Sequence, residues 1–116
     1  MKKILLVDDE NTILDILEDY LSNYYEVITC NNPINVKNLI EEHKFSVVIS
    51  DYNMPGIDGE TLSKEINGKS GIGFILLSGY DDIDELMAHP NINMVHQKPV
   101  NLRTLKKDID MISEGY

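Results

Sequence analysis

Acidic, hydroxyl and lysine side chains stand at the ends of four apolar runs in this sequence. Asp8 and Asp9 follow the first run, and Asp51, Ser78 and Lys98 end or follow three later ones. Carboxylate oxygens are the ligands that a hard divalent cation such as Mg²⁺ prefers. A cation beside a hydroxyl and a lysine has the parts needed for phosphoryl transfer, in which Asp51 can attack phosphorus and become an aspartyl phosphate.

These side chains converge only if the apolar runs are neighbouring strands of one sheet. Residues 47–49 form a β-branched run of the kind found in strands that are buried on both faces. Segments with helical spacing of apolar residues separate the strands. We expect strands over 4–7, 26–30, 47–51, 73–78 and 92–97, and helices over 12–23, from 31–33 to about residue 40, over 59–67, over 81–88, and after Asn101 as a cap.

The alternation of five strands with five helices predicts an α/β fold. Such a pattern favours a parallel sheet with helices on both faces and right-handed crossovers. We expect a single domain over residues 1–116, a doubly wound, flavodoxin-like (βα)5 fold with strand order 2-1-3-4-5. The first and third strands are neighbours in that order, and the crevice between them is the topological switch point. Asp8, Asp9 and Asp51 are therefore expected to converge there.

Three converging carboxylates repel one another and need a positive charge nearby. Each close pair costs about 4 kcal/mol at a separation of about 4 Å and an effective dielectric constant of about 20. Lys98 is one candidate for the compensating charge, and a bound divalent cation is the other. A site with few carboxylates and room for water suits Mg²⁺ better than Ca²⁺, and the sequence lacks the spacing of an EF-hand loop.

Composition limits the classes of partner. The chain has 116 residues with a net charge of −10, so we expect it to bind neither nucleic acid nor an anionic membrane directly. The same charge favours cations and basic protein surfaces. Cys30, the single cysteine, lies in an apolar run and is interpreted as a core residue. The sequence has no apolar run long enough for a signal peptide or a membrane span, and we expect a cytoplasmic protein.

Four fragments, taken in order, resemble the receiver domain of two-component response regulators. Each fragment alone is a weak signal, but the ordered set has the family's spacing and covers essentially the whole chain. The resemblance implies the fold expected above and a role in phosphorelay signal transduction. The fragments are LLVDDE at residues 5–10, DYNMPGIDG at 51–59, LLSG at 76–79 and Lys98-Pro99.

The resemblance also implies a role for each acidic residue. Asp51 would be the phosphoacceptor. Asp8 and Asp9 would hold Mg²⁺ (or Mn²⁺) together with Asp51, and Asn53 would contribute its backbone carbonyl. The side chain of Asn53 would also flank the route by which water attacks the phosphate, and so influence the lifetime of the phosphate.

Further positions are implied to bind the phosphoryl group and to switch. Ser78 and Lys98 would contact the phosphoryl oxygens, and the bond from Lys98 to Pro99 would be cis, a form that proline makes accessible. The family often places Tyr or Phe three residues before the lysine, where this chain has Val95. We therefore expect the signal to pass through Ser78 and the loop after it, with Tyr80 tuning the lifetime of the phosphate.

By resemblance, the chain would take its phosphoryl group from a histidine kinase or a histidine phosphotransfer protein. It would then change conformation and signal to an output domain or target protein, as a signalling module and not a turnover enzyme. Three alternatives remain: a Mg²⁺-dependent phosphatase, a flavin-binding module, and a degenerate receiver that only binds partners. The phosphatase would need an acid where Asn53 stands, and Asp8, Asp9 and Glu10 would repel a flavin phosphate.

Overall fold

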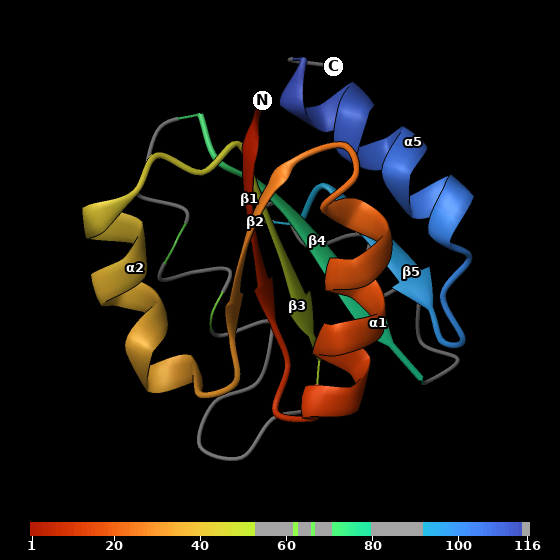
Figure 1. Cartoon of the computed structure of the whole chain (residues 1–116), viewed down its shortest axis with the longest axis horizontal. Helices are drawn as coiled ribbons and strands as arrows, with labels where there is room; N and C mark the ends of the chain where they lie inside the picture. Colours follow the sequence, from red (N-terminus) through yellow and green to blue (C-terminus); the bar gives the residue numbers. More distant parts are fainter. Residues whose placement is uncertain (53–61, 63–65, 67–70, 80–91, 115–116) are drawn as a thin grey trace.

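The computed structural model describes residues 1–52, 62, 66, 71–79 and 92–114 (Figure 1). One five-stranded parallel sheet runs through the described part, with strand order β2-β1-β3-β4-β5. This confirms the predicted α/β architecture. The strands are β1 (Lys3–Val7), β2 (Glu26–Cys30), β3 (Val47–Asp51), β4 (Gly73–Ser78) and β5 (Met94–Gln97); the helices are α1 (Asn11–Leu21), α2 (Val36–Glu42), the 3-10 helix η1 (Pro33–Asn35) and α5 (Leu102–Ser113).

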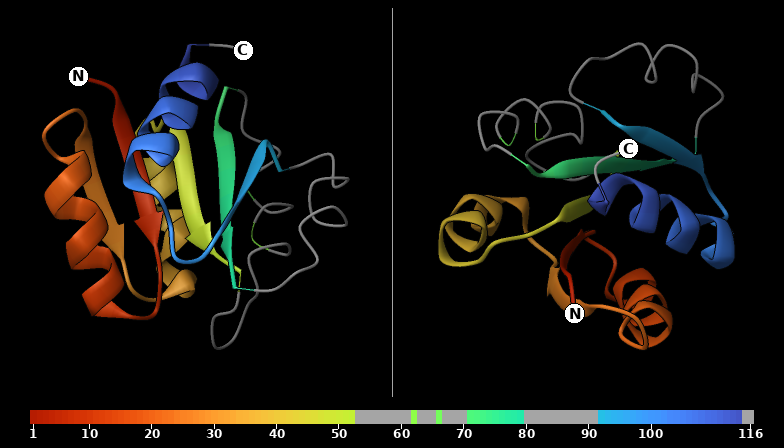
Figure 2. Two further views of the ribbon diagram at one scale, coloured as in Figure 1. Left: turned by 90° about the vertical axis from the view of Figure 1, so that its right-hand side faces the viewer. Right: turned by 90° about the horizontal axis from the view of Figure 1, so that it is seen from above.

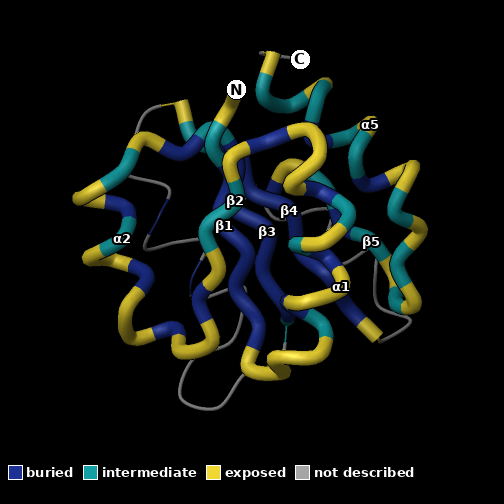
Figure 3. The backbone as a smooth tube through the Cα atoms, in the orientation of Figure 1, coloured by how far each residue is buried: buried dark blue, intermediate teal, exposed yellow. Residues whose placement is uncertain are grey.

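Helices cover both faces of the sheet and create two separate apolar cores. Figure 2 shows α2 on one face and α1 with α5 on the other. Because β3 and β4 are covered on both sides, every residue of these two strands is buried. Figure 3 shows the resulting pattern, with buried central strands inside a shell of helices whose outer sides are exposed.

The helices form where the apolar spacing predicts them. In α1 the buried residues Leu14, Leu17 and Leu21 follow helical spacing, and in α5 Leu105 and Ile109 do the same. These five side chains fill the core between the two helices and the sheet. The hydrophobic pattern of each helix therefore sets the face that it turns to the sheet.

Polar caps set the starts of two helical segments. Asn101 accepts a hydrogen bond from the backbone N–H of Thr104, which confirms its predicted role as the cap of α5. Asn32 accepts from the N–H of Ile34 and begins η1. The second helix was predicted to start at residues 31–33, whereas the α-helix proper starts at Val36, because the capped segment first forms a 3-10 turn.

Two predicted helices fall largely outside the described residues. Of the predicted helix over 59–67 the structure describes Leu62 and Ile66, which are helical and buried in the core on the α2 side. The predicted helix over 81–88 lies wholly outside the described residues. In the part of the chain that is described, no helix is long and apolar enough to cross a membrane.

Candidate functional site

The carboxyl ends of the strands bring the predicted site residues to one edge of the sheet. Asp8 directly follows β1, Asp51 ends β3, Ser78 ends β4 and Lys98 directly follows β5. Backbone hydrogen bonds extend the ladder past these ends: the N–H of Asp8 donates to the carbonyl of Cys30 at 3.1 Å, and that of Lys98 to Ser78 at 2.8 Å. The side chains are therefore mounted on the ordered sheet and not on free loops.

Three carboxylates form a cluster at the predicted switch point between β1 and β3. Oxygens of Asp8, Asp9 and Asp51 lie within 4.8 Å of one another. Asp8 and Asp51 are buried, with 1% and 6% of their surface exposed, and Asp9 is exposed. Such a cluster is unfavourable without a cation, because each carboxylate repels the other two.

Within this cluster, Asp8 is a nearly fully buried carboxylate. Its Oδ1 accepts a hydrogen bond from the N–H of Glu10 at 2.9 Å. Its Oδ2 is buried and has no hydrogen-bond partner among the described residues. Burial raises the pKa of Asp8 to about 6; the Glu10 hydrogen bond opposes this rise, and the charge of Asp51 adds to it. The free protein therefore holds a buried carboxylate that lacks sufficient compensation.

Lys98 supplies part of the missing positive charge. Its Nζ lies 2.8 Å from Asp51 Oδ1 and 4.0 Å from Asp8 Oδ2. Burial by itself lowers the pKa of Lys98, but the hydrogen bond to Asp51 and the charges of Asp51 and Asp8 outweigh it and raise the pKa. Lys98 is thus protonated at neutral pH, yet a single ammonium group cannot balance three carboxylates.

The residues present fit a divalent cation. The buried Oδ2 of Asp8 accepts no hydrogen bond from the described residues, so it is an oxygen ligand available to a cation. Asp9 and Asp51 offer further oxygens within 4.8 Å, and the exposure of Asp9 leaves that side open to water. A small set of carboxylates with an open side matches the way proteins bind Mg²⁺.

The remaining predicted site residues are placed as follows. Ser78 is fully buried at the end of β4, opposite Gln97 in the register. Val95 is buried on the α2 side of the sheet, away from α5. The Lys98–Pro99 peptide bond is cis, as the resemblance implied. Two predicted residues, Asn53 and Tyr80, lie outside the described residues.

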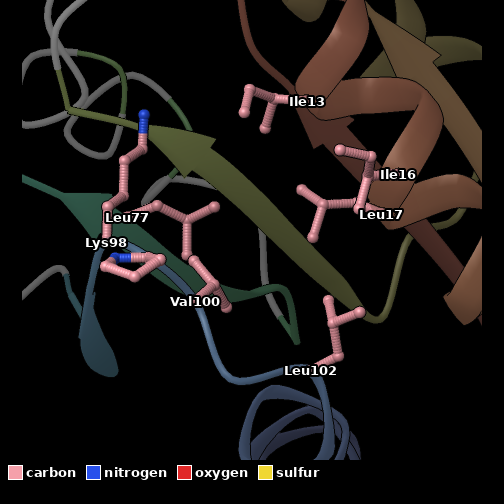
Figure 4. Close-up of a pocket in the computed structure, with 8 residues that line it drawn as sticks. Ile13, Ile16, Leu17, Leu77, Lys98, Val100 and Leu102 are labelled. Carbon is pink, nitrogen blue, oxygen red and sulfur yellow. The ribbon is translucent and has the colours of Figure 1, made fainter.

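Sequence reasoning missed an apolar groove beside the cluster. It has a volume of about 490 Å³ and lies between α1 and the segment that joins β5 to α5. Figure 4 shows Lys98 at its wall, with the ammonium extending toward the end of β3. Ile16 of α1, which lines this groove, is 54% exposed. The lining residues are Ile13, Ile16, Leu17, Leu77, Lys98, Pro99, Val100 and Leu102.

A second feature missed from the sequence is a side-chain hydrogen bond between β5 and α5. His96 Nε2 on β5 lies 2.6 Å from Asp108 Oδ2 on α5. The two residues are 12 positions apart. Because their contact depends on how α5 packs against the sheet, no local sequence pattern indicates it.

Comparison with known proteins agrees with this geometry. The sequence matches the family model of the response regulator receiver domain over residues 4–110. The two-component response regulator ARR12 of Arabidopsis thaliana is 34% identical over 110 residues, which are 90% of this chain and 18% of that protein. The probable transcriptional regulator ycf27 of Guillardia theta is 37% identical over 83 residues, 71% of this chain and 33% of that protein. The chain therefore spans well under half the length of either relative.

Solved structures show the same fold. A response regulator receiver domain protein from Clostridium thermocellum has a TM-score of 0.90 and 28% identity, covering 98% of this chain and 95% of that chain. The response regulator protein TrrA from Thermotoga maritima, in complex with Mg(2+)-BeF, has a TM-score of 0.86 and 30% identity, covering 97% and 99%. Together with the family match over most of its length, these likenesses establish that the chain belongs to the response regulator receiver domain family.

Proposed function

We propose that this chain is a phosphoacceptor receiver domain that takes a phosphoryl group onto Asp51. The observation that carries the proposal is the position of this carboxylate. Asp51 ends β3, is buried, and lies 2.8 Å from the ammonium of Lys98, beside the carboxylates of Asp8 and Asp9. A nucleophile held next to a cation and next to oxygen ligands for a metal has the arrangement that phosphoryl transfer needs.

Asp8, Asp9 and Asp51 would hold Mg²⁺ (or Mn²⁺), with the backbone carbonyl of Asn53 as a further ligand. The ion, when bound, would stabilise negative charge on the phosphoryl oxygens. The buried Oδ2 of Asp8, which accepts no hydrogen bond within the described part of the chain, supports this assignment. So does the relative TrrA, which was solved in complex with Mg(2+)-BeF.

The donor would be the phosphohistidine of a histidine kinase or of a histidine phosphotransfer protein. An oxygen of Asp51 attacks phosphorus, the new P–O bond forms and the P–N bond to the imidazole breaks. The imidazole leaves with the electron pair of that bond. Lys98 transfers its ammonium contact from Asp51 to a phosphoryl oxygen, and the hydroxyl of Ser78 donates a hydrogen bond to another.

The donor surface would include the apolar groove beside Lys98. Ile16 of α1 is 54% exposed at this groove, and exposed acids flank it on the same helix at Asp15 and Asp19. An amphipathic helix with an apolar face and basic flanks would fit both the groove and the charges. Docking there would place a phosphohistidine close to the carboxyl edge of the sheet.

The aspartyl phosphate would shift a two-state equilibrium of the domain and so signal to an output domain or target protein. In this role the domain, residues 1–116, is a signalling module and not a turnover enzyme. Ser78, Tyr80 and Pro99 would take part in the switch, with Val95 in the place that often holds an aromatic ring. A cytoplasmic location is part of the same proposal, and the free, buried thiol of Cys30 is compatible with a reducing compartment.

Intact-mass spectrometry with acetyl phosphate and Mg²⁺ tests the proposal. The wild type should gain one phosphoryl group, and Asp51→Asn should gain none. A labelled Asp51→Asn protein would show that the nucleophile is a different residue. Continuous release of inorganic phosphate without any labelled protein would favour the phosphatase alternative, and a wild type without label would favour the degenerate receiver.

A further inference from the structure

Two side chains at the carboxyl end of β5 make polar contacts on the same side of the strand. His96 Nε2 lies 2.6 Å from Oδ2 of Asp108 on α5. Two residues later, Lys98 Nζ lies 2.8 Å from Asp51 Oδ1. Side chains two residues apart on an extended strand point to the same face, and the N–H of Lys98 continues the ladder by donating to the carbonyl of Ser78. One short stretch of chain therefore connects the acidic cluster with α5.

The contact between His96 and Asp108 is shielded from water. The two side chains are 10% and 15% exposed. In the sheet register His96 stands beside the buried Leu77 of β4, and Asp108 directly precedes Ile109, which is fully buried on the inner face of α5. Water competes with this hydrogen bond much less than with one on the open surface, so removing one partner has a larger effect.

The covalent route from Lys98 to α5 is less direct. It passes through Pro99 and Asn101, both of which are exposed, before the helix begins. The contact between His96 and Asp108 reaches the middle of the helix instead. It thereby ties the strand end that carries Lys98 to the body of α5.

We propose that His96 and Asp108 are a positioning pair that holds Lys98 toward Asp51 and couples the phosphoryl site to the docking of α5. This inference rests on the proposed function, because phosphorylation moves the Lys98 contact from the carboxylate to the phosphoryl group. A change in the position of Lys98 then acts on β5 and reaches α5 through the pair. Coupling between two sites is reciprocal, so the docking of α5 also influences the phosphoryl site.

Backbone hydrogen exchange of the full chain tests this coupling, with Mg²⁺ and beryllium fluoride as the probe in place of a phosphoryl group. In the wild type, the probe should slow exchange at residues 51–52 and should change exchange across 102–113 by about fivefold, the lower end of typical coupling. His96→Val and Asp108→Asn should keep the response at 51–52. Each should reduce the response of 102–113 to less than about twofold.

Three further variants separate coupling from general damage to the protein. His96→Gln keeps an N–H donor for Asp108 and should restore part of the α5 response. The double variant of His96→Val with Asp108→Asn should respond as each single variant does, because both remove the same contact. Lys106→Gln is the matched control: it removes an ion pair within α5, from Lys106 to Asp110 at 2.8 Å, and should leave the response intact.

The outcomes distinguish this inference from the function on which it rests. If residues 51–52 respond in every protein and 102–113 respond equally in the wild type and in both single variants, the positioning pair is wrong and the phosphoacceptor proposal stands. The proposal of a positioning pair is also wrong if, in the wild type, the probe changes exchange at residues 51–52 but not across α5. If residues 51–52 of the wild type do not respond at all, both proposals fail together.

Discussion

Replacement of Asp8 by Asn should stabilise the metal-free protein at neutral pH. The buried Asp8 carboxylate has a pKa raised from 3.8 to about 6, chiefly by burial. At about 1.36 kcal/mol for each tenfold change in the proton equilibrium, this rise corresponds to about 3 kcal/mol of unfolding free energy. Asn keeps the acceptor for the N–H of Glu10 but carries no charge, so the variant avoids this penalty.

The sign of the pH dependence follows from the direction of this shift. Between about pH 4 and pH 6 the folded state binds more protons at Asp8 than the unfolded state does. The unfolding free energy therefore falls as the pH rises through this window, and the full penalty is present above about pH 6. Asp8→Asn removes this contribution. The variant's advantage in unfolding free energy should therefore grow from near zero at about pH 4 to about 3 kcal/mol above about pH 6.

Urea unfolding in EDTA at pH values from 4 to 8 measures this difference. The same unfolding experiment is then repeated with Mg²⁺. An ion that binds only the folded state raises the unfolding free energy by about 2.7 kcal/mol when its concentration is about a hundred times its Kd. Mg²⁺ should stabilise the wild type and have little effect on Asp8→Asn. The raised pKa of Asp8 would be contradicted if the unfolding free energies of the two proteins changed in parallel with pH. It would also be contradicted if Asp8→Asn were less stable than the wild type at pH 7 in EDTA.

Three other substitutions have expected effects on unfolding by urea at pH 7. Lys98→Met should destabilise the protein by about 1–3 kcal/mol, because it leaves the Asp51 carboxylate without its partner charge. The loss is smaller than for a fully buried ion pair, because the site is partly open to solvent. Tyr25→Phe should lose about 1.5–3 kcal/mol, because the Tyr25 hydroxyl donates to Asp110 Oδ1 at 2.5 Å. Gly73→Ala should lose about 1–3 kcal/mol, because a Cβ there collides with a side chain of α5.

Matched controls accompany these three substitutions. Lys37→Met and Tyr24→Phe alter exposed residues of α2 and of the segment after α1, and Gly79→Ala adds a Cβ in open space. Each control should stay within about 0.5 kcal/mol of the wild type. A control that is as damaging as its partner would show that the named contact is not the cause.

The strands and the edge that carries the site could be predicted from the sequence. The predicted strands at 26–30 and 73–78 match β2 and β4 residue for residue. β4 could be recognised because a strand covered on both faces reads as a continuous apolar run. Asp8 and Asp51 could be placed together because the resemblance to receiver domains implies a doubly wound sheet with strand order 2-1-3-4-5. The switch between β1 and β3 then brings their ends to the same point.

Other features depend on distances that no local pattern contains. In the described part of the chain, one oxygen of Asp8 accepts a hydrogen bond from Glu10 while the other is buried and accepts none. The contact between His96 and Asp108 depends on the packing of α5 over β5. The start of α2 shifted to Val36 because the cap at Asn32 favours a 3-10 turn, a competition between two helical geometries that the apolar spacing does not resolve.

The most direct test of the central claim is the chemical identity of the phosphorylated residue. Borohydride reduces an aspartyl phosphate to homoserine, so tandem mass spectrometry of the tryptic peptide over residues 45–64 can locate the modification after treatment with acetyl phosphate and Mg²⁺. We expect homoserine at position 51 and an unmodified Asp58 in the same peptide. Homoserine at another acid, or an unmodified peptide from a protein that has gained a phosphoryl group, would contradict it.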